Sequence, residues 1–336
     1  MAFNRRLFIQ TAAAATAVSR LSISKSYAAE HKYKIAISIP PAHSIPRALQ
    51  AAAADILRET NGALDIQVFA GGTLGSDTDT ISQVRSGAIE FCCTAGLVWG
   101  TLVPTASLSV VAFAFPDYDA VWKAMDGDLG GHIREGFSKV GLVPQPKIFD
   151  YGFRHITTAA KRIETPADLS GAKIRVPVSP MLLSLFKALG AAPASMNFSE
   201  LYTALQTKIV DGQENPLALV ETAKLYEVQK NCAMTYHAWD GFWLVANRRA
   251  WNALPANLRE IASKQFEQHA TRQRAENAAL EATLVDGLKA RGMVFNSVDG
   301  GKFRQALQKA DFYKSAKDKF GSEAWKIFEK YAGKLT

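Results

Sequence analysis

The sequence has few cysteines and histidines and no long apolar run, and each shortage excludes a class of protein. Only three cysteines occur in 336 residues, too few for a disulfide scaffold. No stretch approaches the roughly 20 apolar residues of a membrane-spanning helix, which excludes a multispan membrane protein. Six scattered histidines argue against a histidine-rich metal site. With 48% hydrophobic and 21% charged residues, the composition is that of an ordinary soluble globular protein, and the length suits two domains.

Common catalytic and cofactor motifs are also missing. The sequence contains no G-x-S-x-G, H-E-x-x-H or C-x-x-C pattern. The glycine-rich segments Gly71–Gly75 and Gly127–Gly131 match neither a phosphate loop nor a dinucleotide fingerprint, and we interpret both as turns. Asp77–Asp79 lacks the later ligands of a calcium loop, so we interpret its acids as helix-capping. Three histidines are acid–base candidates by residue type alone: His43, His155 and His237.

The first 28 residues have the pattern of an export signal. A twin arginine, Arg5 and Arg6, precedes a mild apolar run, and Ser26 and Ala28 place small residues at a cleavage site. The segment resembles twin-arginine signals; the alternative is an amphipathic N-terminal helix. Its removal takes away four basic residues and no acid, which lowers the net charge from +8 to +4. We therefore expect a periplasmic protein without a nucleic-acid footprint.

Because an exported protein can form disulfides, we consider whether the three cysteines pair. Cys92 and Cys93 are adjacent and would strain to bridge each other. Cys232 could pair with one of them only if the fold brings them together. We expect three buried free thiols.

The first half of the chain alternates strands and helices. We expect strands over Lys34–Ile39, Leu64–Val68 and Ile89–Thr94. Between them we expect a helix that Ser44 caps and a second helix over Asp77–Arg85. This β-α-β-α-β series indicates a parallel α/β sheet.

The same alternation resumes later and indicates a second α/β lobe. Helices are expected to begin at Thr165 and Ser199. The expected strands are Val143–Ile156, Lys173–Val176, Ser195–Phe198, Ala233–Tyr236 and Phe242–Ala246.

A long segment without helix breakers follows the two lobes. Ala256–Asp286 contains no glycine or proline over 31 residues, about 46 Å if helical. Its thin apolar stripe suits a helix that lies across both lobes. The alternative, a coiled-coil arm, lacks a sustained heptad of large residues.

Three parts of the sequence resemble a known family: Asp168–Pro177; Phe198–Gln206 running into Val210–Pro216; and Leu74–Asp77 with Val84–Ile89. In this order they resemble the solute-binding subunits of tripartite ATP-independent periplasmic (TRAP) transporters, the DctP-type family. The resemblance extends from about Tyr33 to Tyr331.

The resemblance implies an α/β fold with two lobes, a ligand cleft between them and a long helix that bridges both. It implies that the protein binds an organic acid, without a cofactor, and delivers it to the membrane permease subunits of a TRAP transporter. We expect lobe I to comprise residues 29–151 with about 241–280. Lobe II would comprise 152–240 with about 281–331, and the lobes would close on the ligand by hinge motion.

The resemblance also assigns a carboxylate clamp to Arg175. In the family this arginine forms a bidentate salt bridge with the ligand, and the planar guanidinium matches a carboxylate as lysine cannot. From the sequence alone, an ion pair with Asp168 or Glu164 is the competing interpretation.

Three more site residues follow from the resemblance. Asn215 matches an amide donor to the same carboxylate, Phe198 an aromatic side chain against the ligand, and Arg154 a second arginine. The branch of the family that uses a metal ion differs near Asn215, so we expect no bound metal.

Sheet geometry suggests weaker candidates. Ligands of open α/β sheets bind at the carboxyl ends of strands. His43 and Thr94 follow expected strands and could face the cleft, while Trp239, with Phe242 and Trp243, could line an aromatic pocket or pack the hinge. Together with Phe153 and Phe198, these aromatic residues favour an aromatic or apolar-tailed acid over a sugar acid.

Two other functions compete with transport. A periplasmic hydrolase using His237 and Asp240 needs a nucleophile beside the histidine, and no motif supplies one. A ligand-sensing partner of a membrane receptor would share the fold and the site, and the sequence leaves that alternative open.

Overall fold

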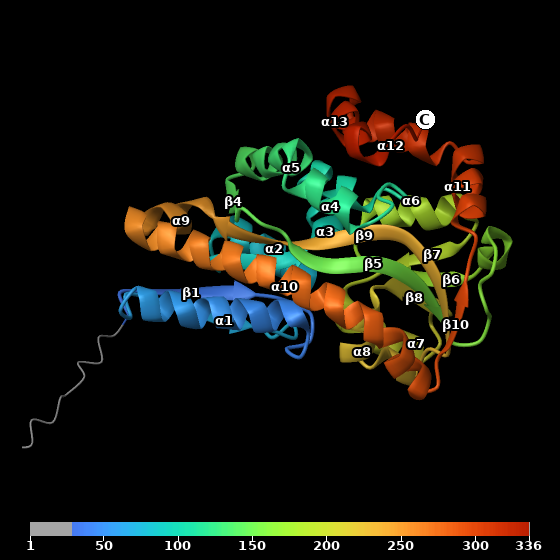
Figure 1. The fold of residues 1–336 in the computed structure, drawn as a ribbon, viewed down its shortest axis with the longest axis horizontal. Coiled ribbons are helices and arrows are strands. Elements are labelled where there is room, and N and C mark those ends of the chain that lie inside the picture. The colour runs from blue at the N-terminus through green and yellow to red at the C-terminus, as the bar shows by residue number, and fades with distance from the viewer. Residues whose placement is uncertain (1–28, 336) are drawn as a thin grey trace, which may run out of the picture.

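The computed structural model describes residues 29–335, so the expected export signal lies outside the described residues. Ten strands form one mixed sheet (Figure 1). They are β1 (His31–Ala36), β2 (Leu64–Phe69), β3 (Phe91–Ala95), β4 (Leu142–Pro144), β5 (Phe149–Thr158), β6 (Lys173–Val176), β7 (Ala192–Ser195), β8 (Gly212–Asn215), β9 (Asn231–Asn247) and β10 (Val294–Ser297). The order is β2-β1-β3-β9-β5-β8-β6-β7, and β4 and β10 also pair with β9.

Helices flank this sheet on both faces (Figure 1). The α-helices are α1 (Ser44–Glu59), α2 (Asp77–Ser86), α3 (Gly96–Trp99), α4 (Tyr118–Met125), α5 (Asp128–Lys139), α6 (Pro180–Ala188), α7 (Phe198–Gln206), α8 (Leu217–Thr222), α9 (Arg248–Ala253), α10 (Ala256–Ala290), α11 (Gly300–Lys309), α12 (Phe312–Phe320) and α13 (Ser322–Ala332). Short 3₁₀ turns cover Pro104–Val110, Pro166–Leu169 and Leu225–Glu227.

The expected α/β lobes are present, but the sheet is not all parallel. Strands β1, β2 and β3 pair in parallel, as do β6, β7 and β8, and each group forms the sheet of one lobe. Strand β9 runs antiparallel to both β3 and β5 and joins the groups. It is one strand of 17 residues, whereas the sequence predicted two strands separated by His237–Gly241. The polar side chains of this segment stay in the strand because the fold supplies partners for them: His237 contacts Glu214, and the Trp239 indole donates to Asp150.

The predicted bridging helix is confirmed. Helix α10 has 35 residues and runs from α1, against which it packs, across β5 to α8 (Figure 1). Its contact with β5 is polar: the Gln273 side chain accepts a hydrogen bond from the Asp150 amide at 2.9 Å and donates one to the Asp150 carbonyl at 2.8 Å. Such anchors explain why a thin apolar stripe is enough to hold this helix.

Several local predictions need correction. His43, not Ser44, caps α1, because its ring Nδ1 accepts a hydrogen bond from the Ile45 amide. The strand expected at Ser195–Phe198 is β7, three residues earlier, and Phe198 instead begins α7 behind the N-cap residue Asn197. The glycines near Gly127 start helix α5 and do not form a separate turn.

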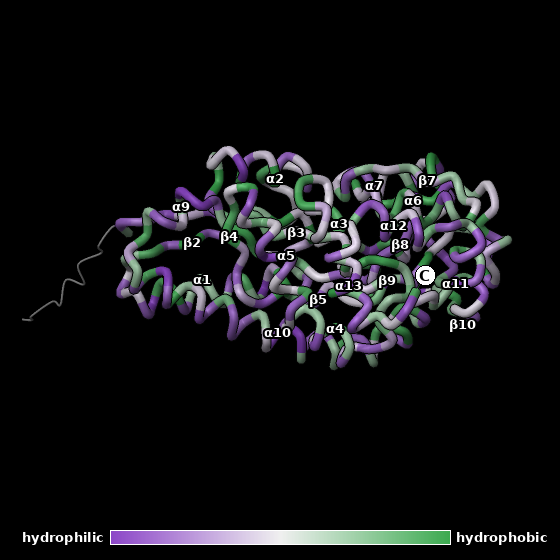
Figure 2. The backbone as a smooth tube through the Cα atoms, turned by 90° about the horizontal axis from the view of Figure 1, so that it is seen from above, coloured by the Kyte–Doolittle hydropathy of each residue, from purple (hydrophilic) through white to green (hydrophobic). Residues whose placement is uncertain are grey.

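The apolar core follows the sheet through both lobes, and hydrophilic segments lie toward the edges of the molecule (Figure 2). All three cysteines are free and buried, as predicted. No described helix combines the length and hydropathy needed to cross a membrane. Helix α12 packs on α6, and α13 packs on α4 and α5, so the C-terminal helices contact both lobes.

Candidate functional site

A cavity lined by residues of both lobes opens between them. Four of the seven predicted site residues line it: Arg154, Arg175, Phe198 and Asn215. Arg175 and Asn215 lie near the carboxyl ends of β6 and β8, as expected for a ligand site in an α/β sheet. The other lining residues are Ser38, Ile39, Asp77, Ala95, Leu97, Val98, Tyr151, Pro177 and Phe242.

Arg175 is buried in the cavity wall without an anionic partner. Its Nε and Nη2 donate to the Met196 carbonyl at 3.2 and 2.8 Å, which fixes the plane of the guanidinium. No carboxylate of the described residues forms an ion pair with it, and the expected competitor Asp168 instead caps its own turn. Burial lowers the pKa of Arg175 to about 10, despite the opposing charges of Glu214 and Asp77. The Nη1/Nη2 end of this desolvated cation is the part that the carbonyl leaves free to bind a carboxylate.

Arg154 is equally buried but has an internal partner. Its Nε donates to Glu214 Oε2 at 2.5 Å and its Nη2 to Glu214 Oε1 at 2.7 Å. Burial alone would lower the pKa of Arg154, but the charge and hydrogen bonds of Glu214 outweigh it and hold this pKa above its usual value. Nη1 has no hydrogen-bond partner and lies 3.9 Å from Asp240 Oδ2. Arg154 therefore forms a neutral ion pair with Glu214, and its Nη1 remains free to donate.

Asn215 links the Arg154–Glu214 ion pair to the cavity. Its Oδ1 accepts hydrogen bonds from Arg154 Nη2 at 3.0 Å and from the Tyr151 hydroxyl at 3.1 Å. Its Nδ2 donates one hydrogen to Gln213 Oε1 at 2.5 Å. Because an amide nitrogen carries two hydrogens, the second is available to a ligand. Because these two hydrogen bonds hold Oδ1 in place, Asn215 faces the ligand as a donor.

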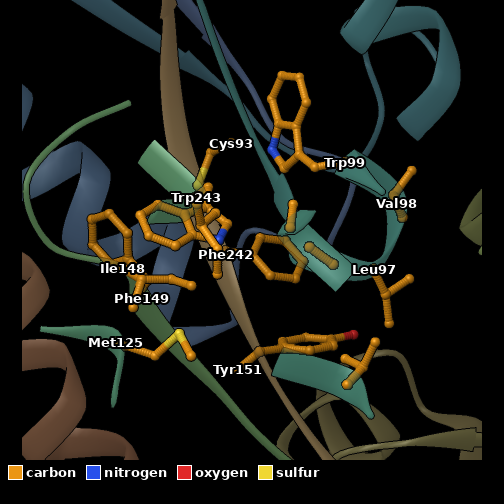
Figure 3. Packing of buried hydrophobic residues seen from close by; sticks show 14 of the residues in the cluster. Cys93, Leu97, Val98, Trp99, Met125, Ile148, Phe149, Tyr151, Phe242 and Trp243 are labelled. Atoms are coloured by element: carbon orange, nitrogen blue, oxygen red, sulfur yellow. The ribbon is translucent and has the colours of Figure 1, made fainter. Parts of the chain in front are cut away.

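Aromatic rings form part of the cavity wall. Phe198 begins α7 on one side, while Tyr151 and Phe242 pack together on the other with ring centroids 4.6 Å apart. Figure 3 shows Tyr151 and Phe242 near Leu97 in the apolar cluster, and all three residues line the cavity. The other aromatic residues on which the sequence-based ligand preference rested, Phe153, Trp239 and Trp243, do not line the cavity.

Asp77 lines the cavity and was not among the predicted site residues. Its Oδ1 accepts hydrogen bonds from Ser38 Oγ at 2.5 Å and from Thr94 Oγ1 at 3.0 Å. Thr94 therefore contacts the site only through Asp77. One sequence signal could have identified this residue: Asp79 forms the capping box of α2 with Ser76, which leaves Asp77 without a capping role.

His43 and Trp239 lie outside the cavity. Burial lowers the pKa of His43 to about 3, so its ring is neutral and serves as the cap of α1. The Trp239 indole donates to Asp150 Oδ1 at 2.9 Å and packs edge-on against Trp122. Both residues support the structure around the site, and neither lines the cavity.

The histidine of the hydrolase hypothesis is buried in β9. His237 contacts Thr235 Oγ1 at 2.7 Å and Glu214 Oε2 at 3.1 Å, and none of these three residues lines the cavity. Burial lowers the pKa of His237. Among the described residues, no group of three or more His, Cys, Asp or Glu side chains could hold a metal ion.

A two-lobed fold with a charged cavity between the lobes defines a ligand-binding protein. The profile of the family described as bacterial extracellular solute-binding protein, family 7 (DctP), matches residues 35–317. The chain therefore belongs to this family, and the resemblance stated from the sequence is confirmed. It is a solute-binding protein of the kind that serves TRAP-type transporters.

Individual relatives agree with this assignment. A 2,3-diketo-L-gulonate-binding periplasmic protein of Escherichia coli is 34% identical over 258 residues, which are 75% of this chain and 77% of the relative. A TRAP solute-binding protein of Roseobacter denitrificans, solved with β-D-glucuronate, is 28% identical with a TM-score of 0.85 over 90% of this chain and 99% of that one. A succinate-bound one from Sulfurospirillum deleyianum is 26% identical with a TM-score of 0.84 over 91% and 99%.

Proposed function

We propose that this protein holds its organic acid by a carboxylate clamped on Arg175. The observation that carries the proposal is a buried guanidinium, oriented by a carbonyl and lacking a carboxylate partner, at the wall of a cavity between two lobes. A buried charge is costly unless it is paired, and a ligand carboxylate supplies that pair. Asn215 donates its free amide hydrogen to the same carboxylate, and Phe198 contacts the rest of the ligand.

Closure of the lobes follows from the strands that cross between them. Lobe I comprises residues 29–151 with about 241–280, and lobe II comprises 152–240 with about 281–331. Strand β5 has register shifts against β9 between Asp150 and Gly152 and between Arg154 and Ile156, next to this boundary. Gly152 has a φ of +116°, a conformation that glycine adopts without strain. These irregularities support a hinge at the crossing strands.

In this proposal the protein is exported, captures the acid in the periplasm and delivers it to the transporter. The twin-arginine pattern at the N-terminus supports secretion to the periplasm of a chain that is already folded. The partners are the membrane permease subunits of a TRAP transporter, and the protein catalyses no reaction. A sensing role at a membrane receptor would use the same site, so adjacent genes for two membrane subunits would favour transport.

A thermal-shift screen of the mature protein against organic acids tests the proposal. A ligand at 100 times its dissociation constant adds about 2.7 kcal/mol to the free energy of unfolding, which raises the melting temperature measurably. We expect one or more carboxylates to stabilise the protein and their amide analogues to have no effect. Equal stabilisation by acids and their neutral amides would contradict the carboxylate clamp.

A further inference from the structure

Asp77 places a second charge in the ligand cavity, opposite in sign to Arg175. Its side chain is buried, and it comes from the first turn of α2 in lobe I, while Arg175 comes from β6 in lobe II. The Phe198 amide of lobe II lies 3.5 Å from Asp77 Oδ2, so the carboxylate sits where the two lobes meet. Thr78 and Asn197 make a neighbouring contact between the lobes, at 3.3 Å.

The hydrogen bonds of Asp77 leave one of its oxygens free to accept. Two hydroxyl groups already donate to Oδ1, from Ser38 and Thr94. Oδ2 has only the Phe198 amide, at the outer limit of a hydrogen bond. A carboxylate oxygen accepts two hydrogen bonds, so Oδ2 retains capacity at the cavity wall. Among the described residues, no lysine or arginine forms an ion pair with Asp77.

The charges of the cavity then restrict the ligand. Arg154 is neutralised by Glu214, which leaves one cation, Arg175, and one anion, Asp77. A ligand carboxylate on Arg175 balances that cation. A second carboxylate in the same cavity would face Asp77 without a cation, and an apolar tail would leave Asp77 Oδ2 desolvated and unpaired.

We propose that Asp77 makes this site selective for a monocarboxylic acid that carries hydroxyl groups, one of which donates to Asp77. This inference rests on the proposed function, because it assumes that the ligand carboxylate is on Arg175. It replaces the preference for an aromatic or apolar-tailed acid, since most of the aromatic side chains behind that preference lie outside the cavity. A site built to accept a hydroxyl hydrogen bond rejects analogues without it strongly.

Calorimetry with acids of matched length tests the selectivity. The hydroxy acids are D-erythronate, D-gluconate, D-galacturonate and D-glucuronate. Their comparison compounds are butanoate and hexanoate, which lack hydroxyls, the dicarboxylates succinate and adipate, and the amino acid norleucine. We expect at least one hydroxy acid to bind at least about 100-fold more tightly than any comparison compound. A comparison compound that binds as tightly as the best hydroxy acid would overturn the inference.

Matched variants assign the effect to Asp77. The Asp77→Asn variant should bind the best hydroxy acid about 10- to 100-fold more weakly, because a hydrogen bond to a charged acceptor is lost, and its relative affinity for succinate or adipate should rise. Asp79→Asn makes the same change two residues away, outside the cavity, and should leave both affinities unchanged. The decisive measurement is the ratio of the affinity for the hydroxy acid to that for the dicarboxylate. A general loss of structure would weaken binding of every acid alike and leave this ratio unchanged.

The outcomes separate this inference from the proposed function. If acids bind through Arg175 but Asp77→Asn leaves their ratio unchanged, only the role of Asp77 fails. If Asp77→Asn does not fold, Thr94→Val provides a second test: it removes a hydrogen bond to Oδ1 and should change the same ratio in the same direction by a smaller factor. If Thr94→Val leaves that ratio unchanged, the role of Asp77 fails. If no acid in the thermal-shift screen or the calorimetry binds the wild-type protein, the proposed function fails and this inference fails with it.

Discussion

Arg154 and Arg175 enter the same cavity from β5 and β6, the two strands that flank β8, yet their surroundings differ in one decisive way. Both guanidinium groups are almost completely buried. Arg154 has Glu214 as a bidentate partner, whereas Arg175 has only a backbone carbonyl. Their pKa values move apart accordingly, upward for Arg154 and downward to about 10 for Arg175. The comparison teaches that a buried arginine with an internal partner supports the structure, while one without such a partner is available to bind a ligand.

Breaking the internal pair gives the largest expected effect. The Glu214→Ala variant leaves Arg154 buried without its counter-ion and should lower the free energy of unfolding by about 3–5 kcal/mol. Denaturant unfolding of wild type and variant measures the difference. Glu164→Ala, which removes the exposed ion pair with Arg162, is the control and should cost less than about 1 kcal/mol. Equal losses in the two variants would show that the Arg154 pair is not structural.

Truncating the other arginine should affect binding and spare the fold. Arg175→Ala should weaken binding of the ligand carboxylate by about 2–5 kcal/mol, the cost of removing one partner of a buried charge pair. It should not lower the melting temperature of the ligand-free protein as Glu214→Ala does, because it removes an unpaired buried charge. Arg175→Lys should also weaken binding, since a point charge cannot form the bidentate contact. An unchanged dissociation constant in Arg175→Ala contradicts the site assignment.

Asn215 lies between the two arginines and should give an intermediate result. Asn215→Ala removes a proposed donor to the ligand and an acceptor of Arg154, so it should weaken binding by about 1–3 kcal/mol and also cost some stability. Calorimetry and thermal unfolding of one preparation separate the two effects. A variant that loses stability but keeps its affinity would restrict Asn215 to the internal network.

Asp150, which does not line the cavity, provides a prediction about pH. Burial raises the pKa of Asp150 from 3.8 to about 7, against the hydrogen bonds from Asn277 and Trp239. Between about pH 4 and pH 7 the folded protein therefore holds a proton that the unfolded chain has released, and the stability from this group falls as pH rises. Asp150→Asn should remove this contribution, at most about 1.4 kcal/mol per pH unit. Parallel pH profiles for wild type and Asp150→Asn would contradict the shifted pKa.

Local features of the fold were predictable where short-range signals dominate. Strand β6 has the predicted bounds Lys173–Val176 because glycine and proline delimit it. Helix α10 was predicted because its sequence lacks breakers, although it continues four residues past the predicted end. Gly287 does not stop it, since a single exposed glycine costs a helix only about 1 kcal/mol. Strand β9 was divided in the prediction because its buried polar residues resemble a turn until their distant partners are known.

The site was predictable in part for the same reason. Arg175 and Asn215 were identified from short segments that resemble the family, and both line the cavity. Asp77 was missed because its partners Ser38, Thr94 and Phe198 are 39, 17 and 121 residues away in the sequence. Nor could the sequence distinguish the two arginines, since the pairing of Arg154 with Glu214 spans 60 residues.

A crystal structure of the mature protein with a bound acid tests the central claim most directly. The account predicts one ligand carboxylate oxygen within about 3 Å of each of Arg175 Nη1 and Nη2, with the Arg154–Glu214 pair intact. A ligand carboxylate bound to Arg154 in place of Glu214, with Arg175 not in contact with the ligand, would contradict it.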